Sequence, residues 1–80
     1  MNFDQLCLNL YSKDEDSHVH IENFYASVNG DEKHVVLIKI NYNDLTKHIL
    51  WAADTEEEAI SGAKHEAIYF MRILTNDLYK

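Results

Sequence analysis

Five histidines give this 80-residue sequence its clearest capacity for chemistry. Imidazole is the commonest metal ligand and titrates near neutral pH. His18 and His20 are two positions apart, so in a strand both side chains point to one side. The turns described below place His48 on that side, two strands or about 9.6 Å away, with Lys39 between them. Zinc ligands lie about 2.0–2.1 Å from the metal. We therefore expect solvated histidines and no metal site.

A single cysteine, Cys7, is the other reactive side chain. One cysteine excludes an internal disulfide and a cysteine-based zinc site, and is typical of a reducing cytoplasm. A cysteine nucleophile needs an adjacent base and an oxyanion-binding loop, and no motif supplies them. The two glycines, Gly30 and Gly62, are isolated, so a glycine-rich phosphate loop is absent. The sequence predicts no enzyme, no catalytic residue and no cofactor.

Acidic residues dominate the charge, with 14 Asp and Glu against 7 Lys and Arg and a net charge of −7. This balance argues against direct nucleic-acid binding, which needs clustered Lys and Arg. An acidic surface instead suits a protein partner with a basic surface. No apolar run approaches the length of a membrane span, and the first ten residues lack the basic region of a signal peptide. We expect a cytoplasmic protein with no membrane partner.

The elements that position these side chains begin with an alternating segment. Within Asn2–Tyr11, Leu6, Leu8 and Leu10 share one side at a period of two, which predicts a strand. The polar, acidic loop Ser12–Ser17 then ends that segment.

Two tight turns divide the next part of the chain. Asn29-Gly30 is a strong hairpin signal, because both central residues of a type I′ turn need positive φ, and Asn43-Asp44 offers a second such turn. A bulge near Glu22-Asn23 would reconcile two apolar phases in the preceding strand. We expect strands at His18–Val28, Lys33–Tyr42 and Thr46–Ala53.

From Asp54 the apolar spacing becomes helical. Asp54 and Thr55 are both good N-cap residues, and each has a Glu three residues on, Glu57 and Glu58 respectively, so a capping box is available. Apolar residues then recur every three or four positions. We expect a long amphipathic helix from Thr55 to about Asp77, with Gly62 permitting close approach to the sheet. The predicted fold is a single α+β domain over residues 1–80. It is a four-stranded antiparallel meander, order 1-2-3-4, with one C-terminal helix on one face (ββββα).

The turns also fix a register and two faces. Ile21 faces Ile38, Ile38 faces Ile49, and Val36 faces Trp51, so this apolar face must lie under the helix. The opposite face is mixed and carries an apolar patch: Phe24, Val35, Leu37 and Leu50. Such a patch marks a protein interface. The alternative is a scatter of ordinary exposed apolar residues.

Chain direction gathers acidic residues at the two ends of the sheet. Six converge where the first turn meets the helix start, with Lys33 as the counter-charge: Asp31, Glu32, Asp54, Glu56, Glu57 and Glu58. A second group lies at the other end: Asp14, Glu15, Asp16 and Asp44. Helix capping and solubility explain the six without a partner. The functional alternative is electrostatic capture of a basic surface.

Two resemblances extend this interpretation. The stretch from Phe24 to Leu74 resembles the βββα part of a double-stranded-RNA-binding domain. That family holds phosphates with a basic helix start, and Glu56, Glu57 and Glu58 reverse the charge at the matching positions. The whole chain is similar in size, acidity and α+β build to small phage-encoded anti-CRISPR and other anti-defence proteins. That resemblance implies an inhibitor in the host-cell cytoplasm that occupies a nucleic-acid-binding surface of its target.

The leading hypothesis is therefore a non-enzymatic protein-binding module of the phage-inhibitor type. It would occupy a basic surface of a host defence protein with its acidic end. The candidate partner-binding residues are those six acids together with Phe24, Leu37 and Leu50. The alternative is a small structural or regulatory bacterial protein that forms a homodimer through the open sheet face or an edge strand.

Overall fold

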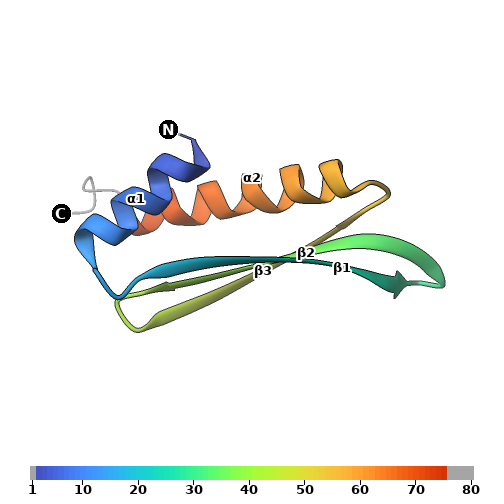
Figure 1. The fold of residues 1–80 in the computed structure, drawn as a ribbon, viewed down its shortest axis with the longest axis horizontal. Helices are drawn as coiled ribbons and strands as arrows, with labels where there is room; N and C mark the ends of the chain where they lie inside the picture. Colours follow the sequence, from blue (N-terminus) through green and yellow to red (C-terminus); the bar gives the residue numbers. More distant parts are fainter. Residues whose placement is uncertain (1, 76–80) are drawn as a thin grey trace.

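The computed structural model describes residues 2–75 as a sheet covered on one face by two helices (Figure 1). The elements in chain order are α1 (Phe3–Lys13), β1 (His18–Val28), β2 (Asp31–Tyr42), β3 (Leu45–Ala53) and α2 (Glu56–Thr75). The antiparallel α+β architecture with a long C-terminal helix is confirmed. The described sheet has three strands in the order β1-β2-β3, so the prediction of four strands is wrong. The helix end expected at Asp77 lies outside the described residues.

The segment predicted as the first strand is helix α1. Its start is closed by a capping box, in which the Gln5 N–H donates to the Asn2 side chain at 2.8 Å and the Asn2 N–H donates to the Gln5 side chain at 3.3 Å. Phe3, Leu6 and Leu10 are buried, a spacing that suits one face of a helix. Leu8, which a strand would have placed beside them, is 67% exposed. Burial therefore follows the helical period.

Both predicted tight turns are confirmed. Asn29 and Gly30 have φ of 55° and 88°, and the second turn, Asn43-Asp44, has φ of 49° and 67°, as a type I′ turn requires. The predicted pairs are observed: Ile21 with Ile38, Ile38 with Ile49, and Val36 with Trp51. The register between β1 and β2 is continuous from end to end, so the bulge expected near Glu22-Asn23 is wrong. The residues of β1 instead alternate between the two faces without interruption, and part of β1 is left exposed.

The core lies between the covered face of the sheet and the two helices. Three alanines and one methionine form the α2 stripe: Ala59, Ala63, Ala67 and Met71, each fully buried. They pack with the α1 residues and with the inward residues of the strands: Val36, Ile38, Ile40 and Ile49. A Cβ on Gly62 would overlap the indole of Trp51, so the glycine does permit the predicted close approach. Neither α1 nor the described part of α2 is long and apolar enough to cross a bilayer.

Candidate protein interface

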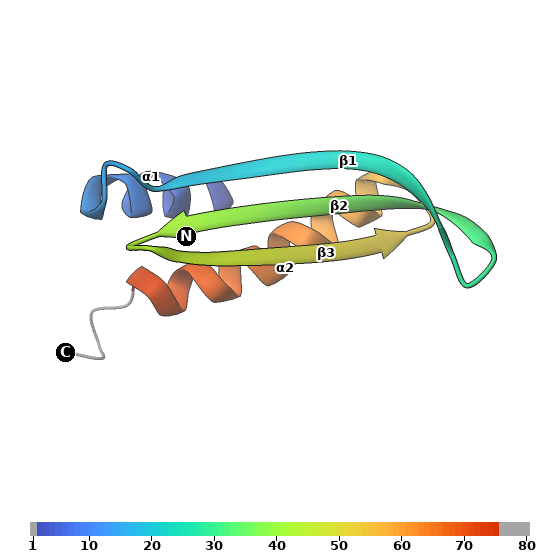
Figure 2. The same ribbon diagram turned by 90° about the horizontal axis from the view of Figure 1, so that it is seen from below.

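The sheet face opposite the helices is uncovered (Figure 2). Its central strand contributes alternate residues, and the register places Phe24 beside Val35 and Leu37 beside Leu50. These four residues are the open-face patch. Phe24 is 42% and Leu50 66% exposed, whereas Val35 is buried between its cross-strand neighbours. The predicted apolar patch is therefore present on a face that no described element covers.

The six acidic residues predicted at one end are all exposed, and we call them the acidic end: Asp31, Glu32, Asp54, Glu56, Glu57 and Glu58. Lys33 and Asp54 form an ion pair there. The hydrogen bond to Asp54 and its charge, with the charges of Asp31 and Glu58, raise the pKa of Lys33. The same bond lowers the pKa of the Asp54 carboxyl. The structure thus brings acids from β2, the loop after β3 and α2 around one cation.

The acidic end and the open-face patch adjoin one another. His34 pairs with Ala53 at the end of the β2–β3 ladder, and the Lys33–Asp54 contact continues that ladder by one position. Lys33 and Val35 lie two residues apart on one strand, so they share the open face. The open-face patch and the acidic end therefore meet at Lys33 and Asp54, while Glu57 and Glu58 lie on the helix side of the sheet, beside Trp51 and Ala53.

The three glutamates of the acidic end occupy the first turn of α2. The Glu58 N–H donates to Thr55 Oγ1 at 3.1 Å, and the Thr55 hydroxyl donates to Glu58 Oε1 at 3.0 Å. Thr55 thus caps the helix through the Glu58 N–H, and the Glu58 carboxylate accepts from the Thr55 hydroxyl. All three carboxylates also sit favourably at the positive end of the helix dipole. These glutamates therefore contribute to the stability of α2.

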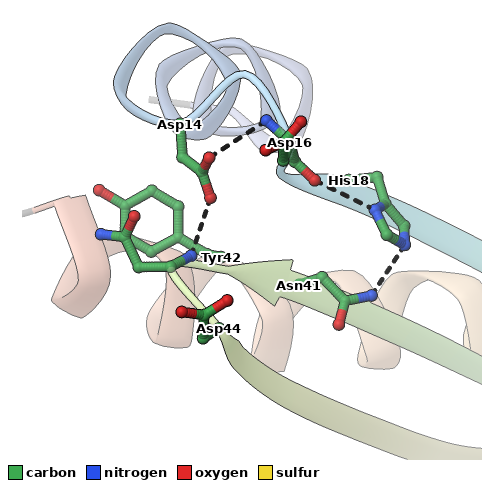
Figure 3. A pocket seen from close by; sticks show the side chains of 7 residues that line it. Asp14, Asp16, His18, Asn41, Tyr42 and Asp44 are labelled. Carbon is green, nitrogen blue, oxygen red and sulfur yellow. Dashed lines mark hydrogen bonds between the residues drawn. The ribbon is translucent and has the colours of Figure 1, made fainter.

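Among the acids at the opposite end, Asp14 serves the fold, as the pocket in Figure 3 shows. Asp14 accepts the Asp16 N–H at 3.1 Å through one oxygen and the Asn43 N–H at 2.8 Å through the other. It thereby ties the loop after α1 to the β2–β3 turn. His18 Nε2 lies 2.8 Å from the Asn41 amide and His18 Nδ1 lies 3.5 Å from the Asp16 carbonyl. The neutral tautomer protonated at Nδ1 satisfies both contacts.

The histidines do not form a metal site within the described residues. No group of three His, Cys, Asp or Glu side chains in residues 2–75 has a metal-binding arrangement. His20 instead contacts Glu22 at 3.0 Å, and His18 is held by Asn41. These partners on neighbouring positions account for the His-x-His spacing without a metal.

Cys7 lies half-buried on α1. Burial, followed by the charge of Asp4, raises the pKa of the thiol, and Lys64 opposes this shift only in part. A thiol with a raised pKa stays protonated at neutral pH and is a weak nucleophile.

Sequence reasoning missed a second exposed apolar region, beside β3. Trp51 was placed correctly on the covered face, yet it is 38% exposed, and Tyr69 and Ile73 on α2 are 64% and 43% exposed. The signal in the sequence is the four-residue spacing of Tyr69 and Ile73, which sets both on one helix flank. Tyr69 and Ile73 lie outside the buried stripe of α2 that faces the sheet.

Comparisons of the chain with protein-family models, with characterised proteins and with solved structures found no match.

Proposed function

We propose that this chain is a non-enzymatic protein-binding module that occupies a basic surface of a partner protein. The observation that carries the proposal is that an uncovered apolar patch meets the acidic end at Lys33 and Asp54. The patch supplies area that binding removes from water. The acids supply long-range attraction toward a basic partner and discriminate against acidic ones.

The dimensions of the open face suit such a role. β1 has 11 residues, about 36 Å at about 3.3 Å per residue, and three strands span about 14 Å. This flat area of about 500 Å² is smaller than the roughly 800 Å² that each partner buries in a standard interface. The acidic end enlarges the contact beyond the sheet. A partner that engages both surfaces comes closer to the standard size than one that engages the sheet face alone.

The partner chemistry follows from the charges. A groove that binds nucleic acid is lined with Lys and Arg. Such a groove is basic and lacks acidic residues like those of the acidic end. The acidic end presents six carboxylates to such a groove. The proposed action is inhibition by occupancy, of the kind that phage proteins direct at host defence proteins. It needs a rigid scaffold and a displayed charge pattern, and no catalytic group.

Capture from a bacterial lysate with three immobilised baits tests the proposal. The first bait is the wild type, and the second carries Glu56→Gln, Glu57→Gln and Glu58→Gln. Gln retains helix propensity and can still accept the Thr55 hydroxyl bond. The third bait is a matched control that removes three charges at the opposite end: Glu15→Gln, Asp16→Asn and Asp44→Asn. Circular dichroism first establishes that all three baits are folded.

The expected partner is a nucleic-acid-binding protein captured by the wild type and the control but weakly by the Glu56–Glu58 variant. Its association rate should fall as salt rises, because exposed charges are screened, and its own nucleic acid should compete. A partner that binds all three baits equally, or is indifferent to salt, would overturn the role of the acidic end. Substitution of Leu50 by Ser would then show whether the patch alone binds.

A further inference from the structure

Exposed apolar side chains gather along the outer edge of β3. Nine large apolar side chains are exposed among residues 2–75. Five of them lie on β3 or on the flank of α2 beside it: Leu45, Leu50, Trp51, Tyr69 and Ile73. The other four are divided between α1 and β1. A concentration of this kind marks an interaction surface.

Two contacts identify the flank of α2 that faces this edge. Lys47 Nζ lies 5.6 Å from the ring centre of Phe70, and the Trp51 indole lies against Gly62. Residues three or four positions apart share a helix flank. We call the following residues the β3-side flank: Gly62, Glu66, Tyr69, Phe70 and Ile73. The second half of α2 extends past the outer edge of β3 when the sheet is viewed face-on (Figure 2).

The backbone of β3 is also available on this side. Tyr42 and Leu45 flank a two-residue turn, so they form a hydrogen-bonded pair, and such pairs alternate along an antiparallel ladder. The odd-numbered residues of β3 therefore bond to β2. The even-numbered residues turn their N–H and C=O groups outward: Thr46, His48, Leu50 and Ala52. β3 is an edge strand in the described sheet, and an unpaired edge is a template for another strand.

We propose that this edge pairs with β3 of a second copy of the chain, antiparallel, about a two-fold axis at His48. The sheet would become six-stranded, with His48 opposite its own counterpart. Leu45 would lie opposite Trp51 of the second copy, and Lys47 opposite Ile49. This register joins outward-facing residues to outward-facing residues and keeps Leu45, Ile49 and Trp51 on the helix-covered face.

Charge complementarity selects this register. Trp51 and Lys47 contact α2 at its Gly62 and Phe70 positions, so Ile49 lies level with Glu66, midway between them. Lys47 of the second copy, opposite Ile49, therefore comes beside Glu66. A register centred one residue further along β3 would set Glu66 against Glu66 of the second copy and lose this pairing.

The helix layer fits the same arrangement. α2 packs on both β2 and β3, and its second half passes beyond the outer edge of β3 (Figure 2). The two-fold axis lies half a strand spacing outside β3, so it relates the two α2 helices as antiparallel neighbours. The two β3-side flanks then face each other, with the Ile73 end of one against the Gly62 end of the other.

The buried area is adequate for a weak but specific dimer. β3 has nine residues, about 30 Å, and the sheet and helix layers together are about 20 Å deep. The resulting 600 Å² per copy, about 1,200 Å² in total, is the lower bound of a standard interface. The open-face patch remains uncovered, and the acidic ends lie at opposite extremes of the dimer. The inference therefore holds whether or not the proposed function is correct.

Sedimentation equilibrium over a concentration series tests the dimer. The wild type is expected to shift toward twice the monomer mass as concentration rises. His48→Pro removes an outward N–H, so it should leave the monomer fold intact and abolish the shift. Asn23→Pro is the matched control, because Asn23 occupies the corresponding outward position on the β1 edge. This control should dimerise like the wild type.

The helix layer has its own variant pair. Tyr69→Arg with Ile73→Lys places charge on the β3-side flank and should also abolish the dimer. Leu8→Arg with Tyr11→Lys makes the matched change on exposed positions of α1 and should not. Circular dichroism checks the fold of each protein. If His48→Pro does not fold, the Tyr69/Ile73 pair decides.

A cross-link tests the register. In a Cys7→Ser background, His48→Cys would bring two thiols together across the two-fold axis, with Cα atoms about 5.5 Å apart, within the range for a disulfide. Oxidation should give a covalent dimer, and His20→Cys on the other edge strand should not. A wild type that is monomeric at every concentration would overturn the proposal. So would a dimer that survives both His48→Pro and the Tyr69/Ile73 changes.

Discussion

The two faces of strand β2 are built from alternate residues of one sequence, yet the helices cover one face and leave the other uncovered. On the covered face, Val36, Ile38 and Ile40 are almost fully buried. On the open face, Val35 is also buried, but Leu37 is only half-buried and is followed by Lys39. Apolar content alone therefore does not decide coverage. The helices cover the face where strand apolar residues continue across all three strands, because only there do their own stripes find a matching surface.

The largest expected effect comes from the covered face. Ile38→Ala should lower the free energy of unfolding by about 2–5 kcal/mol, because Ile38 is fully buried under the helices and truncation leaves a cavity. Leu37→Ala, next along the strand on the open face, should cost less than about 1 kcal/mol. Urea denaturation measures both. Equal losses would mean that the open face is covered in solution by another molecule.

A second effect concerns the contact between helix and sheet. Gly62→Ala introduces a Cβ where the Trp51 indole lies, and overpacking of this kind typically costs about 1–3 kcal/mol. Alanine regains roughly 1 kcal/mol of helix propensity, so the net loss should be about 0–2 kcal/mol. Trp51 fluorescence should change with it. Ser61→Ala, at an exposed neighbouring position, is the control and should be neutral or slightly stabilising; stabilisation by Gly62→Ala would contradict the packing.

The connection between the helix layer and the sheet gives a smaller effect. Asp14→Ala removes the acceptor for the Asp16 and Asn43 N–H groups, and should cost about 1 kcal/mol in thermal or urea denaturation, since both groups are near solvent. Glu15→Ala is the adjacent control and should be near zero. Similar losses for both would show that the loop does not depend on Asp14.

The smallest effect lies on the open face, at Lys33 and Asp54. The pKa of the Asp54 carboxyl is below its ordinary value of 3.8 in the folded chain, so its contribution to stability is present above that pH and is lost as pH falls through the folded pKa. NMR titration of Asp54 should show the lowered pKa, and Lys33→Met should return it toward 3.8. An unchanged titration in Lys33→Met would mean that the ion pair is not formed in solution.

Much of the fold was predictable because local signals agreed with one another. The two turns needed positive φ and had residues that tolerate it. Once they were placed, antiparallel geometry set every pair in the sheet, and with it both faces. The α2 start was equally well marked by Thr55 and Glu58. The six acids could be assigned to one end for the same reason, since their place follows from strand direction.

The first segment could not be assigned, because its pattern fits two periods. Leu6 and Leu10 are four apart, a spacing that puts residues on one side of a strand and also on one face of a helix. Leu8 favoured the strand, whereas Phe3 and the Asn2–Gln5 capping pair favoured the helix. Packing of α1 beside α2 (Figure 1) buries Phe3 and leaves Leu8 in solvent. That choice depends on a surface made by residues far along the chain.

The sequence by itself determined the turns, the register and the location of charge, because these depend on backbone conformation and on residues adjacent across short loops. Only the tertiary structure decided three other features: the helical state of residues 3–13, the contacts by which Asp14 holds the β2–β3 turn and His18 meets Asn41, and the exposed strip along β3. Each depends on which surfaces meet in space. Burial of a side chain is set by all of its neighbours, and most of them are distant in sequence.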